Sequence, residues 1–370
     1  MYFETQNLSV GYSGKVLIRD ISFSIEKGKI LTIIGPNGAG KSTILKTISR
    51  HLEKIAGAIT IEKDNIFRLS NKELAKKLSV MLTERIEPEL MTCGQVVAMG
   101  RYPYTNNFGT LTPEDRALVS EALRMVRAQE LEERPFSNIS DGQRQRIMLA
   151  RAICQQPSIL ILDEPTSYLD IRHKIELLDI MRKLASEKNV AVILSLHEID
   201  LAAKISDHII CVKGDRIEKC GAPEEVFTSD FIRSLYDIES GSFNTLLGSV
   251  ELVAPLGKPD VFVLGGDGKG IPFYRQLQKN KKAFSTGILY ENDVDYQVAS
   301  ALSGFVVSTE AFNPVSESRL KEAKALIDQT QFFVDAGAKI GVYNKFNGEL
   351  LEYAKRRGKT ILRSPEEIFR

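Results

Sequence analysis

The sequence contains no apolar run of the ~18 to 20 residues that a helix needs to cross a bilayer. Its longest apolar strings, such as residues 190–196, have the length of a strand. The opening residues, Met1-Tyr2-Phe3-Glu4, also lack the basic start and apolar core of a secretion signal. We therefore expect a chain that folds in water and is not exported.

Cysteine is scarce, and charge of one sign is not in excess. The four cysteines, Cys93, Cys154, Cys211 and Cys220, are isolated, and no histidine stands near them at the spacing of a zinc finger. This favours reduced thiols, with neither a disulfide nor a structural zinc. Lys and Arg number 49 against 48 Asp and Glu, so the formal net charge is +1. Such a balance predicts no polybasic surface for nucleic acid.

The length of 370 residues favours two domains, at ~100 to 200 residues each. Pro255, Gly257 and Pro259 interrupt the apolar pattern, and a new alternation of strands and helices begins after them. We therefore predict one domain over residues 1–250 and a second over residues 255–370. Both are expected to be α/β, since short apolar strands alternate with helical stretches.

A glycine-rich segment follows the apolar run Ile30-Leu31-Thr32-Ile33-Ile34 and precedes helical spacing. Residues 35–42 fit the phosphate-loop pattern G-x-x-x-x-G-K-[ST], also called Walker A. Its glycines let backbone N–H groups turn toward phosphate oxygens, Lys41 can reach the outer phosphates, and Ser42 can ligate Mg²⁺. The alternative, an ordinary glycine turn, seldom has this strand-loop-helix context.

Two further segments carry polar groups suited to phosphate chemistry. The strand Ile159-Leu160-Ile161-Leu162 ends in Asp163 and Glu164, which would place one carboxylate near the metal and the other near the attacking water. By itself this pair could simply be two acids that close a strand. Upstream, residues 139–146 present a hydroxyl and a glycine at the start of a helix.

The order of these motifs resembles the ATP-binding subunit of ABC transporters over residues 1–240. Ser140-Asp141-Gly142-Gln143 resembles the family signature, with Asp141 where glycine is commoner. The segment 167–170 resembles the D-loop, and His197 resembles the switch histidine. The resemblance implies a P-loop ABC ATPase domain with an α-helical signature subdomain. The rest of the chain is read as a small, doubly wound, Rossmann-like α/β domain.

The resemblance also implies roles for individual residues. Glu164, His197 and Lys41 would be catalytic, and Ser42, Asp163 and Glu84 would approach Mg²⁺. The residues expected to bind ATP are Tyr12, Gly35, Pro36, Asn37, Gly38, Ala39, Gly40, Lys41, Ser42, Thr43, Glu84, Ser140, Gly142, Gln143 and Asp170. Taken alone, Tyr12 could be a packing residue and His197 an ordinary buried histidine.

One position departs from the family pattern. Aligning Leu82-Thr83-Glu84 with Leu-Pro-Gln puts Glu84 where the family has a glutamine that links Mg²⁺ to the transport channel. A carboxylate can still contact the metal or a water, but it adds negative charge beside the phosphates. The alternative is that Glu84 is a solvated surface residue and that the true loop is shifted.

The resemblance implies a head-to-tail homodimer in which Lys41 and Ser42 of one subunit share each ATP with Ser140 and Gly142 of the other. Two integral membrane permease subunits would dock on the dimer at the cytoplasmic face of the membrane. An extracytoplasmic substrate-binding protein would be an indirect partner. Residues 99–104 with Thr112-Pro113-Glu114-Asp115 resemble the importer branch for iron-siderophores, haem and vitamin B12. An aromatic-rich surface loop is the simpler reading of residues 99–104.

A second class of function stays open, namely a soluble ABC ATPase that acts on ribosomes, DNA or chromosomes. Such proteins usually have tandem cassettes, a long coiled coil or basic inserts, and the sequence shows none of these. For the second domain, three roles are possible: ligand sensing, a structural dimer contact, or a separate enzymatic activity. Residues 265–270, rich in glycine after a strand, could bind a phosphate or another anion, although they fit no known phosphate-loop spacing.

Overall fold

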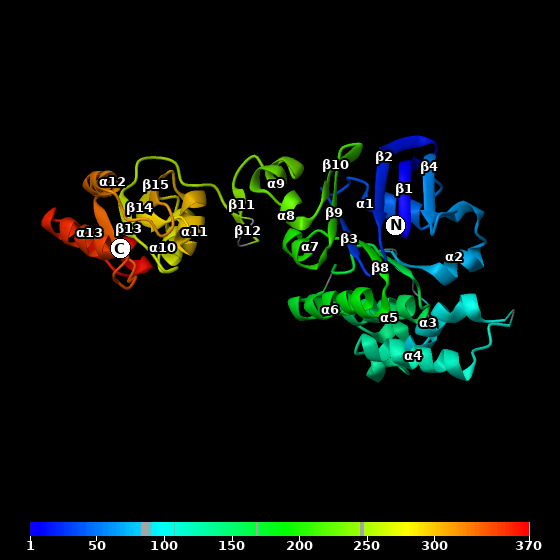
Figure 1. The fold of residues 1–370 in the computed structure, drawn as a ribbon. Coiled ribbons are helices and arrows are strands. Elements are labelled where there is room, and N and C mark those ends of the chain that lie inside the picture. Colours follow the sequence, from blue (N-terminus) through cyan, green and yellow to red (C-terminus); the bar gives the residue numbers. More distant parts are fainter. Residues whose placement is uncertain (83–87, 89, 107, 168, 245–247, 370) are drawn as a thin grey trace. The chain divides into compact units, whose positions relative to one another are not determined.

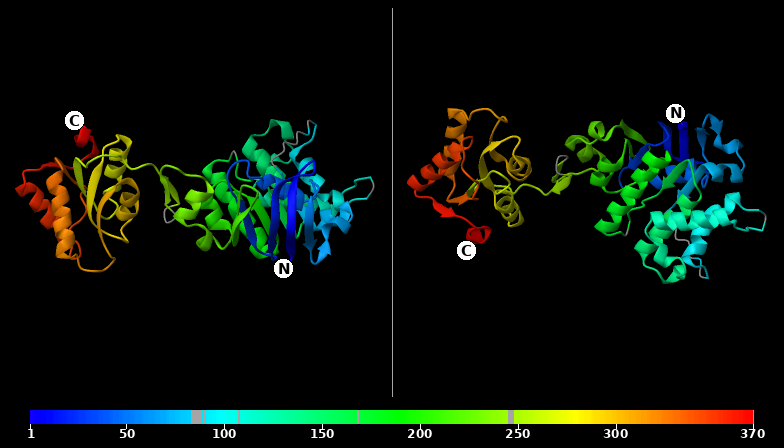
Figure 2. Two further views of the ribbon diagram at one scale, coloured as in Figure 1. Left: turned by 90° about the horizontal axis from the view of Figure 1, so that it is seen from above. Right: turned by 60° about the horizontal axis from the view of Figure 1, so that its bottom comes forward.

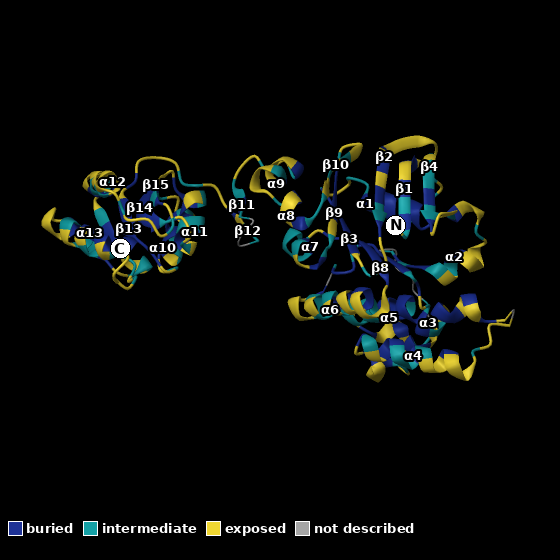
Figure 3. Cartoon of the chain, in the orientation of Figure 1, coloured by how far each residue is buried: buried dark blue, intermediate teal, exposed yellow. Residues whose placement is uncertain are grey.

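The computed structural model describes residues 1–82, 88, 90–106, 108–167, 169–244 and 248–369. The chain divides into two compact units, Met1–Phe231 and Ile232–Arg370. Figure 1 shows the order of the elements, Figure 2 gives two further views, and Figure 3 shows which parts of each element are buried. Compactness does not by itself define a domain that folds alone, so the limits 1–250 and 255–370 stay a prediction.

Two sheets form the first unit. An antiparallel sheet has the order β2-β1-β4-β5, and a larger sheet has the order β10-β9-β3-β8-β7-β6. The larger sheet is parallel except for the pair β9–β10. The strands are β1 (Phe3–Tyr12), β2 (Lys15–Ile25), β3 (Ile30–Ile34), β4 (Ala56–Ile61), β5 (Asp64–Asn65), β6 (Leu78–Met81), β7 (Ile159–Leu162), β8 (Ala191–Ser195), β9 (His208–Lys213) and β10 (Arg216–Gly221).

The helices of the first unit fall into two groups. Those that pack on the sheets are α1 (Lys41–Ile48), α2 (Asn71–Lys77), α6 (Ile171–Lys188), α7 (Ile199–Ile205) and α8 (Pro223–Val226). A separate helical subdomain, at the bottom of Figure 1, contains α3 (Cys93–Ala98), the 3₁₀ segment Met99–Tyr104, α4 (Pro113–Met125) and α5 (Asp141–Cys154). Helix α9 (Ser229–Leu235) crosses the division between the units.

Local sequence explains several of these boundaries. Thr112 caps α4, because its Oγ1 accepts a hydrogen bond from the Asp115 N–H at 3.1 Å while Asp115 Oδ2 accepts from the Thr112 N–H at 3.0 Å. Pro113 occupies the first helical position, where no N–H is needed. Strands β3, β7 and β8 are buried at every position, as expected for parallel strands covered on both faces.

Strand β2 contains two apolar runs, residues 16–18 and 21–25, which are separated by Arg19 and Asp20. The register between β1 and β2 shifts at several points, and Asp20 has a positive φ of 57°. An irregularity of this kind lets one strand continue although its apolar alternation changes phase.

The second unit is a doubly wound α/β fold around a parallel sheet of order β15-β14-β13-β16-β17. Residues of α10 and α11 belong to the apolar cluster on one face of the sheet, and residues of α12 and α13 to the cluster on the other. Its elements are β13 (Val261–Leu264), α10 (Ile271–Lys279), β14 (Phe284–Tyr290), α11 (Val294–Leu302), β15 (Phe305–Thr309), α12 (Glu317–Gln329), β16 (Phe332–Asp335), α13 (Lys345–Arg356) and β17 (Thr360–Leu362).

A short hairpin precedes this sheet and contacts helices α10 and α11. It consists of β11 (Ser242–Asn244) and β12 (Ser249–Glu251). The buried carboxylate of Glu251 pairs with Arg275 of α10 at 3.1 Å, and the Asn244 side chain donates to the Gln297 carbonyl of α11 at 3.1 Å. The hairpin therefore belongs structurally with the second unit, although the sequence places it before the expected domain limit.

Candidate active site

The phosphate loop connects β3 to α1, as the sequence predicts. Gly35, Gly38 and Gly40 have φ values of 153°, 80° and 90°, which L side chains rarely adopt. A Cβ on Gly35 would also lie 2.2 Å from the Val212 carbonyl oxygen, so no larger residue fits there. The helix α1 begins at Lys41, directly after this turn, and its N-terminal end points its unpaired N–H groups toward the loop.

Lys41 is the buried cation of this loop. Its Nζ donates to the Gly35 carbonyl at 2.8 Å and to the Pro36 carbonyl at 3.0 Å. Burial lowers the pKa of Lys41, while the nearby carboxylates of Glu164 and Asp163 raise it and so oppose that effect. The ammonium group is thus held by neutral acceptors that phosphate oxygens can replace.

Ser42 and Asp163 form the expected pair of oxygen donors. Ser42 Oγ donates to Asp163 Oδ1 at 3.1 Å, although the two residues are far apart in the sequence. Asp163 is 1% exposed and follows β7 directly. A hydroxyl and a carboxylate in contact are ligands that Mg²⁺ prefers, so the donor set fits this ion. The structure thus brings together Ser42 and Asp163, the two expected Mg²⁺ ligands that it describes.

Ser195 holds this centre together and was not found from the sequence. It lies at the end of β8 and is completely buried. Its Oγ donates to Asp163 Oδ1 at 2.7 Å and accepts from the Glu164 N–H at 2.9 Å. The sequence feature that could have identified Ser195 is a hydroxyl at the end of an otherwise apolar strand, two residues before His197.

Glu164 and His197 are in direct contact. His197 Nε2 lies 2.5 Å from Glu164 Oε1, and Ser167 Oγ donates to the other carboxylate oxygen at 3.3 Å. Glu164 has a positive φ of 49°, an uncommon conformation for a non-glycine residue. Both side chains are partly exposed, so solvent and a phosphate can reach them.

Tyr12 ends β1 beside the phosphate-loop helix. Its ring is 51% exposed, and its hydroxyl is 3.2 Å from Thr43 Oγ1. An exposed aromatic ring that is fixed to α1 at one end offers its face to a planar base. The structure thus brings Tyr12 to the phosphate loop, as the family resemblance implies.

The signature residues lie in another part of the unit. Ser140 caps α5: its Oγ accepts from the Gln143 N–H at 3.3 Å, and the Gln143 side chain accepts from the Ser140 N–H at 3.0 Å. Gly142 follows in the first turn of the helix. Across the described ranges of the chain, no hydrogen bond or ion pair joins Ser140 to the phosphate loop. Within one chain, therefore, these two halves of the expected ATP site are not assembled.

Asp170 caps α6 and is exposed. Its Oδ1 accepts from the His173 N–H at 2.9 Å, and this bond is the main cause that lowers the pKa of the Asp170 carboxyl. Nearby, Glu198 accepts from Thr166 Oγ1 at 3.0 Å and pairs with Lys174 at 2.6 Å. This network joins the residues after Glu164 to α6 and α7, and it was not predicted from the sequence.

Two expected site positions cannot be located. Glu84 and Tyr168, the latter in the D-loop segment, lie outside the described residues. The assignment of Glu84 as a metal or ATP contact therefore stays a prediction.

A buried ion pair between Arg101 and Asp115 attaches the segment Met99–Tyr104 to α4. Arg101 Nε donates to Asp115 Oδ1 at 2.8 Å, its guanidinium also donates to the Cys154 carbonyl at 2.9 Å, and it stacks over the Tyr104 ring at 4.0 Å. Tyr102, by contrast, is 76% exposed. The buried arginine thus fixes a surface that presents aromatic side chains.

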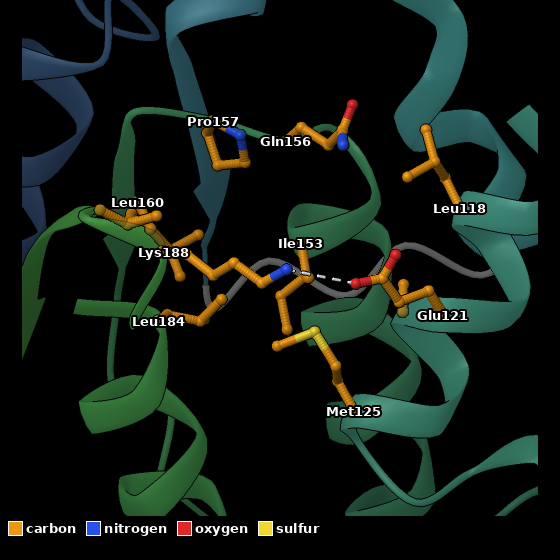
Figure 4. Close-up of a pocket in the computed structure, with 11 residues that line it drawn as sticks. Leu118, Glu121, Met125, Ile153, Gln156, Pro157, Leu160, Leu184 and Lys188 are labelled. Carbon is orange, nitrogen blue, oxygen red and sulfur yellow. Dashed lines mark hydrogen bonds and ion pairs between the residues drawn. The ribbon is translucent and has the colours of Figure 1, made fainter. Parts of the chain in front are cut away.

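A separate pocket of about 240 Å³ lies between α4, the end of α5, β7 and the end of α6 (Figure 4). Apolar side chains such as Leu118, Met125 and Leu160 line it, and the ion pair between Lys188 and Glu121, at 3.4 Å, lies at its side. None of its lining residues belongs to the expected ATP site. The phosphate loop, the contact between Ser42 and Asp163 and the contact between Glu164 and His197 together are the arrangement expected of a P-loop ATPase.

Comparison with known proteins agrees with this class. Residues 18–167 match the ABC transporter family, and residues 284–368 match the MJ0874 family. The uncharacterized ABC transporter ATP-binding protein MJ0873 of Methanocaldococcus jannaschii is 46% identical over 279 residues, which cover 75% of this chain and 96% of that protein. The chain therefore belongs to the ABC transporter ATP-binding proteins.

Further relatives carry more specific names. The cobalamin import ATP-binding protein BtuD of Halobacterium salinarum is 31% identical over 361 residues, 94% of this chain and 90% of that protein. The iron(3+)-hydroxamate import ATP-binding protein FhuC of Bacillus subtilis is 38% identical, but over only 64% of this chain and 88% of that protein.

Solved structures resemble the first part of the chain. CbiO1 of Clostridium perfringens, part of the ABC transporter complex cbiONQ, has a TM-score of 0.54 and 26% identity, covering 63% of this chain and 93% of that one. The ATP-binding cassette MJ0796, solved as a dimer with ADP and Pi, shares the fold with a TM-score of 0.54 and 24% identity, covering 60% and 98%. Within the described ranges, no helix is both long and apolar enough to span a membrane.

Proposed function

We propose that this protein is the ATP-hydrolysing subunit of an ABC importer for a metal chelate. The observation that carries the proposal is the likeness, at 31 to 38% identity, to ATP-binding proteins named for cobalamin and iron-hydroxamate import. The site supports it, because Lys41, Ser42, Asp163, Glu164 and His197 are arranged for ATP hydrolysis.

Among metal chelates, we favour a corrinoid of the cobalamin type over an iron-siderophore. The halobacterial cobalamin importer protein aligns over 94% of this chain, so the alignment extends through both units. The iron-hydroxamate relative covers 64% of the chain, about the extent of the first unit. The alignment with the relative named for cobalamin thus includes the second unit, which supports this choice.

Each residue at the site has a chemical task in this proposal. Lys41 would exchange its two carbonyl contacts for phosphate oxygens, and Tyr12 would stack on the adenine. Ser42 and Asp163, with Glu84 as a further candidate, would hold Mg²⁺, which would neutralise phosphate charge when bound. Glu164 would take a proton from the attacking water, a contribution of roughly 10²- to 10⁴-fold in rate. His197 would orient Glu164 and contact the outer phosphate.

The complete site needs a second subunit. Ser140 and Gly142 are not joined to the phosphate loop of their own chain, so we infer a head-to-tail homodimer in which each ATP lies between Lys41 of one subunit and Ser140 of the other. Asp170 and Gln143 would line the same interface. The exposed Tyr102 and its neighbours would contact one of two permease subunits at the cytoplasmic face of the membrane. A substrate-binding protein outside the cell would complete the importer.

We also propose that the chain is organised as an ATPase domain over residues 1–250 and a Rossmann-like domain over residues 255–370. The second domain would regulate the ATPase or steady its dimer. The described ATP-site residues all precede it, which supports a role outside ATP cleavage. Limited proteolysis with mass spectrometry would locate the boundary, and cleavage between residues 252 and 258 would agree with it.

The test is energised uptake by the whole importer. The chain is co-expressed with the permease genes that neighbour its own, purified with them in detergent and placed in proteoliposomes that contain Mg²⁺-ATP. We expect uptake of cyanocobalamin, and Lys41→Ala should lower both uptake and ATP turnover by at least about 10²-fold. Lys63→Ala, at an exposed position of the same unit, is the matched control. Wild-type activity in the Lys41→Ala variant would contradict the site, and failure to bind any permease would contradict the importer.

A further inference from the structure

The second unit distributes its charges unevenly between the two edges of its sheet. All neighbouring strands in the order β15-β14-β13-β16-β17 are parallel, so every strand begins at one edge and ends at the other. The helix ends and short segments that lead into the strands therefore gather along the first edge. We call this surface the basic edge, and it consists of residues 256–260, 279–283, 303–305, 328–331 and 355–360.

Hydrogen bonds show that these segments are neighbours. The Asp260 N–H donates to the Ala283 carbonyl at 3.4 Å, and the Gln331 N–H donates to the Asp260 carbonyl at 2.9 Å. Lys359 Nζ donates to the Asp328 carbonyl at 3.1 Å. The residues that precede β13, β14, β16 and β17 thus form one continuous surface.

This surface carries an excess of positive charge. Its cations are Lys258, Lys279, Lys281, Lys282, Lys355, Arg356, Arg357 and Lys359. The acids of the same segments are Asp260 and Asp328, and Asp328 already pairs with Arg357 at 2.7 Å. Lys355 pairs with Glu352 at 2.7 Å. Across the residues that the structure describes, the cations of this edge that no ion pair neutralises include Lys258, Lys279, Lys281 and Arg356, which are all exposed.

The opposite edge has the reverse excess. The acids that end or follow strands there are Asp267, Glu291, Asp293, Glu310 and Asp335, and the cations of the same loops are Lys269, Lys339 and Arg363. A cation at the C-terminal end of a helix, such as Lys279 in α10, is stabilised by the helix dipole. That effect accounts for single cations, but it requires neither Lys258, which lies outside any helix, nor the shortage of acids between the segments.

Exposed apolar side chains lie among these cations. Phe305 begins β15 next to β14 and is 37% exposed, Phe369 is 38% exposed, and Leu256 is 92% exposed. Lys282 Nζ lies 5.5 Å from the centre of the Phe369 ring, so this ring borders the same surface. Proteins that lie on an anionic bilayer combine these features, because the cations attract lipid head groups while apolar side chains enter the interface.

We propose that the basic edge binds the surface of a bilayer that contains anionic phospholipid. A bilayer is favoured over a nucleic acid because the proposed function, on which this choice rests, places the chain beside a membrane. Each Lys or Arg close to such a surface strengthens binding by about fivefold, and several together give a salt-sensitive attachment. The second domain would then have a membrane contact of its own, which needs neither the permease nor any residue of the ATPase.

The test is sedimentation of the full-length chain with vesicles, without permease or nucleotide. We expect binding to vesicles of phosphatidylcholine and phosphatidylglycerol, release at high salt, and no binding to phosphatidylcholine alone. Lys281→Gln combined with Arg356→Gln removes two cations from the basic edge and should weaken binding by about 25-fold. Lys269→Gln combined with Lys339→Gln is the matched control, since it removes the same charge from exposed positions at the opposite edge and should leave binding unchanged.

A second pair guards against failure of the first to fold, which circular dichroism melting detects. Lys258→Gln combined with Lys279→Gln changes other segments of the basic edge and should cause a similar loss. Equal binding to both kinds of vesicle, unchanged binding in a folded Lys281→Gln and Arg356→Gln variant, or an equal loss in the control would each overturn the inference. Binding to a double-stranded DNA fragment without binding to phosphatidylglycerol vesicles would also overturn it.

The uptake assay gives an independent result. Uptake by a chain that does not bind vesicles would refute this surface alone. Vesicle binding by a chain that supports no uptake would refute the importer and leave the membrane contact in place.

Discussion

His197 Nε2 lies 2.5 Å from Glu164 Oε1, and the two residues come from the ends of neighbouring strands. Strands β7 and β8 pair in parallel with Leu162 opposite Leu194, so the segments that follow them leave the sheet side by side. The carboxylate expected to activate water is thus already oriented by an imidazole. In the proposed mechanism, this contact holds Glu164 in position to accept a proton from the attacking water.

Glu164→Gln should bind ATP and hardly cleave it, because an amide keeps the shape of the carboxylate but cannot accept the proton. A loss of at least roughly 10²-fold in turnover is expected. ATP would then remain between two subunits, and size-exclusion chromatography with light scattering in Mg²⁺-ATP should show a dimer. A variant that stays monomeric alone and also in the presence of permease would contradict the shared site.

Ser195→Ala should lower turnover by about tenfold, because it removes one hydrogen bond to Asp163 and one from the Glu164 N–H. The Mg²⁺ concentration needed for half-maximal activity should rise, since the metal-binding carboxylate loses its orientation. Ser195→Thr, which keeps the hydroxyl, is expected to restore the Mg²⁺ dependence. If alanine lowers the melting temperature and leaves the Mg²⁺ dependence unchanged, Ser195 has only a structural role.

Asp115→Asn should destabilise the helical subdomain in a pH-dependent way. The Thr112 N–H and Arg101 hold the pKa of the Asp115 carboxyl below its ordinary value. A carboxyl with a depressed pKa in the folded state stabilises above its unfolded pKa, and this stabilisation is lost as pH falls through the folded pKa. Breaking a buried ion pair costs about 3 to 5 kcal/mol, so urea unfolding at neutral pH should show a loss of that order.

The difference in unfolding free energy between wild type and Asp115→Asn should shrink as the solution is acidified below pH ~4, where the carboxyl of the unfolded chain becomes protonated. Asp179→Asn, which removes an exposed ion pair with Lys183, is the control and should change little at any pH. If the difference in unfolding free energy between Asp115→Asn and wild type does not change with pH, the charge of Asp115 contributes nothing to stability.

One thiol should react much faster than the other three. Burial raises the pKa of Cys154 to about 11 and that of Cys211 to about 12, so few thiolates form there at neutral pH. Burial also raises the pKa of Cys93 and, to the extent that its neighbours cover it, that of Cys220. Cys220 differs from the other three because it is exposed on β10, so iodoacetamide can reach it. Iodoacetamide at pH 8 should label one cysteine in the native chain and four in guanidinium, by intact mass. The fast reaction should disappear in Cys220→Ser; two fast thiols would contradict the burial of the others.

The sequence by itself determined where helices and strands form and in what order the expected ATP-site motifs follow one another along the chain. Motifs such as residues 35–42 and the cap at Thr112 act locally, because backbone conformation, helix starts and apolar periodicity depend on residues a few positions apart. The alternation of strands and helices in the second unit could be predicted for the same reason.

Only the tertiary structure decided which side chains meet. Ser195 reaches Asp163 because β7 and β8 are neighbours in register, and no local pattern shows this pairing. The carboxylate of Asp295 in α11 accepts a hydrogen bond from the Gly270 N–H, in the glycine loop that follows β13. Part of a loop that the sequence suggests for phosphate is therefore bonded to a side chain of the same chain. Hydrogen bonds between residues distant in sequence depend on strand order and register, which many segments set together.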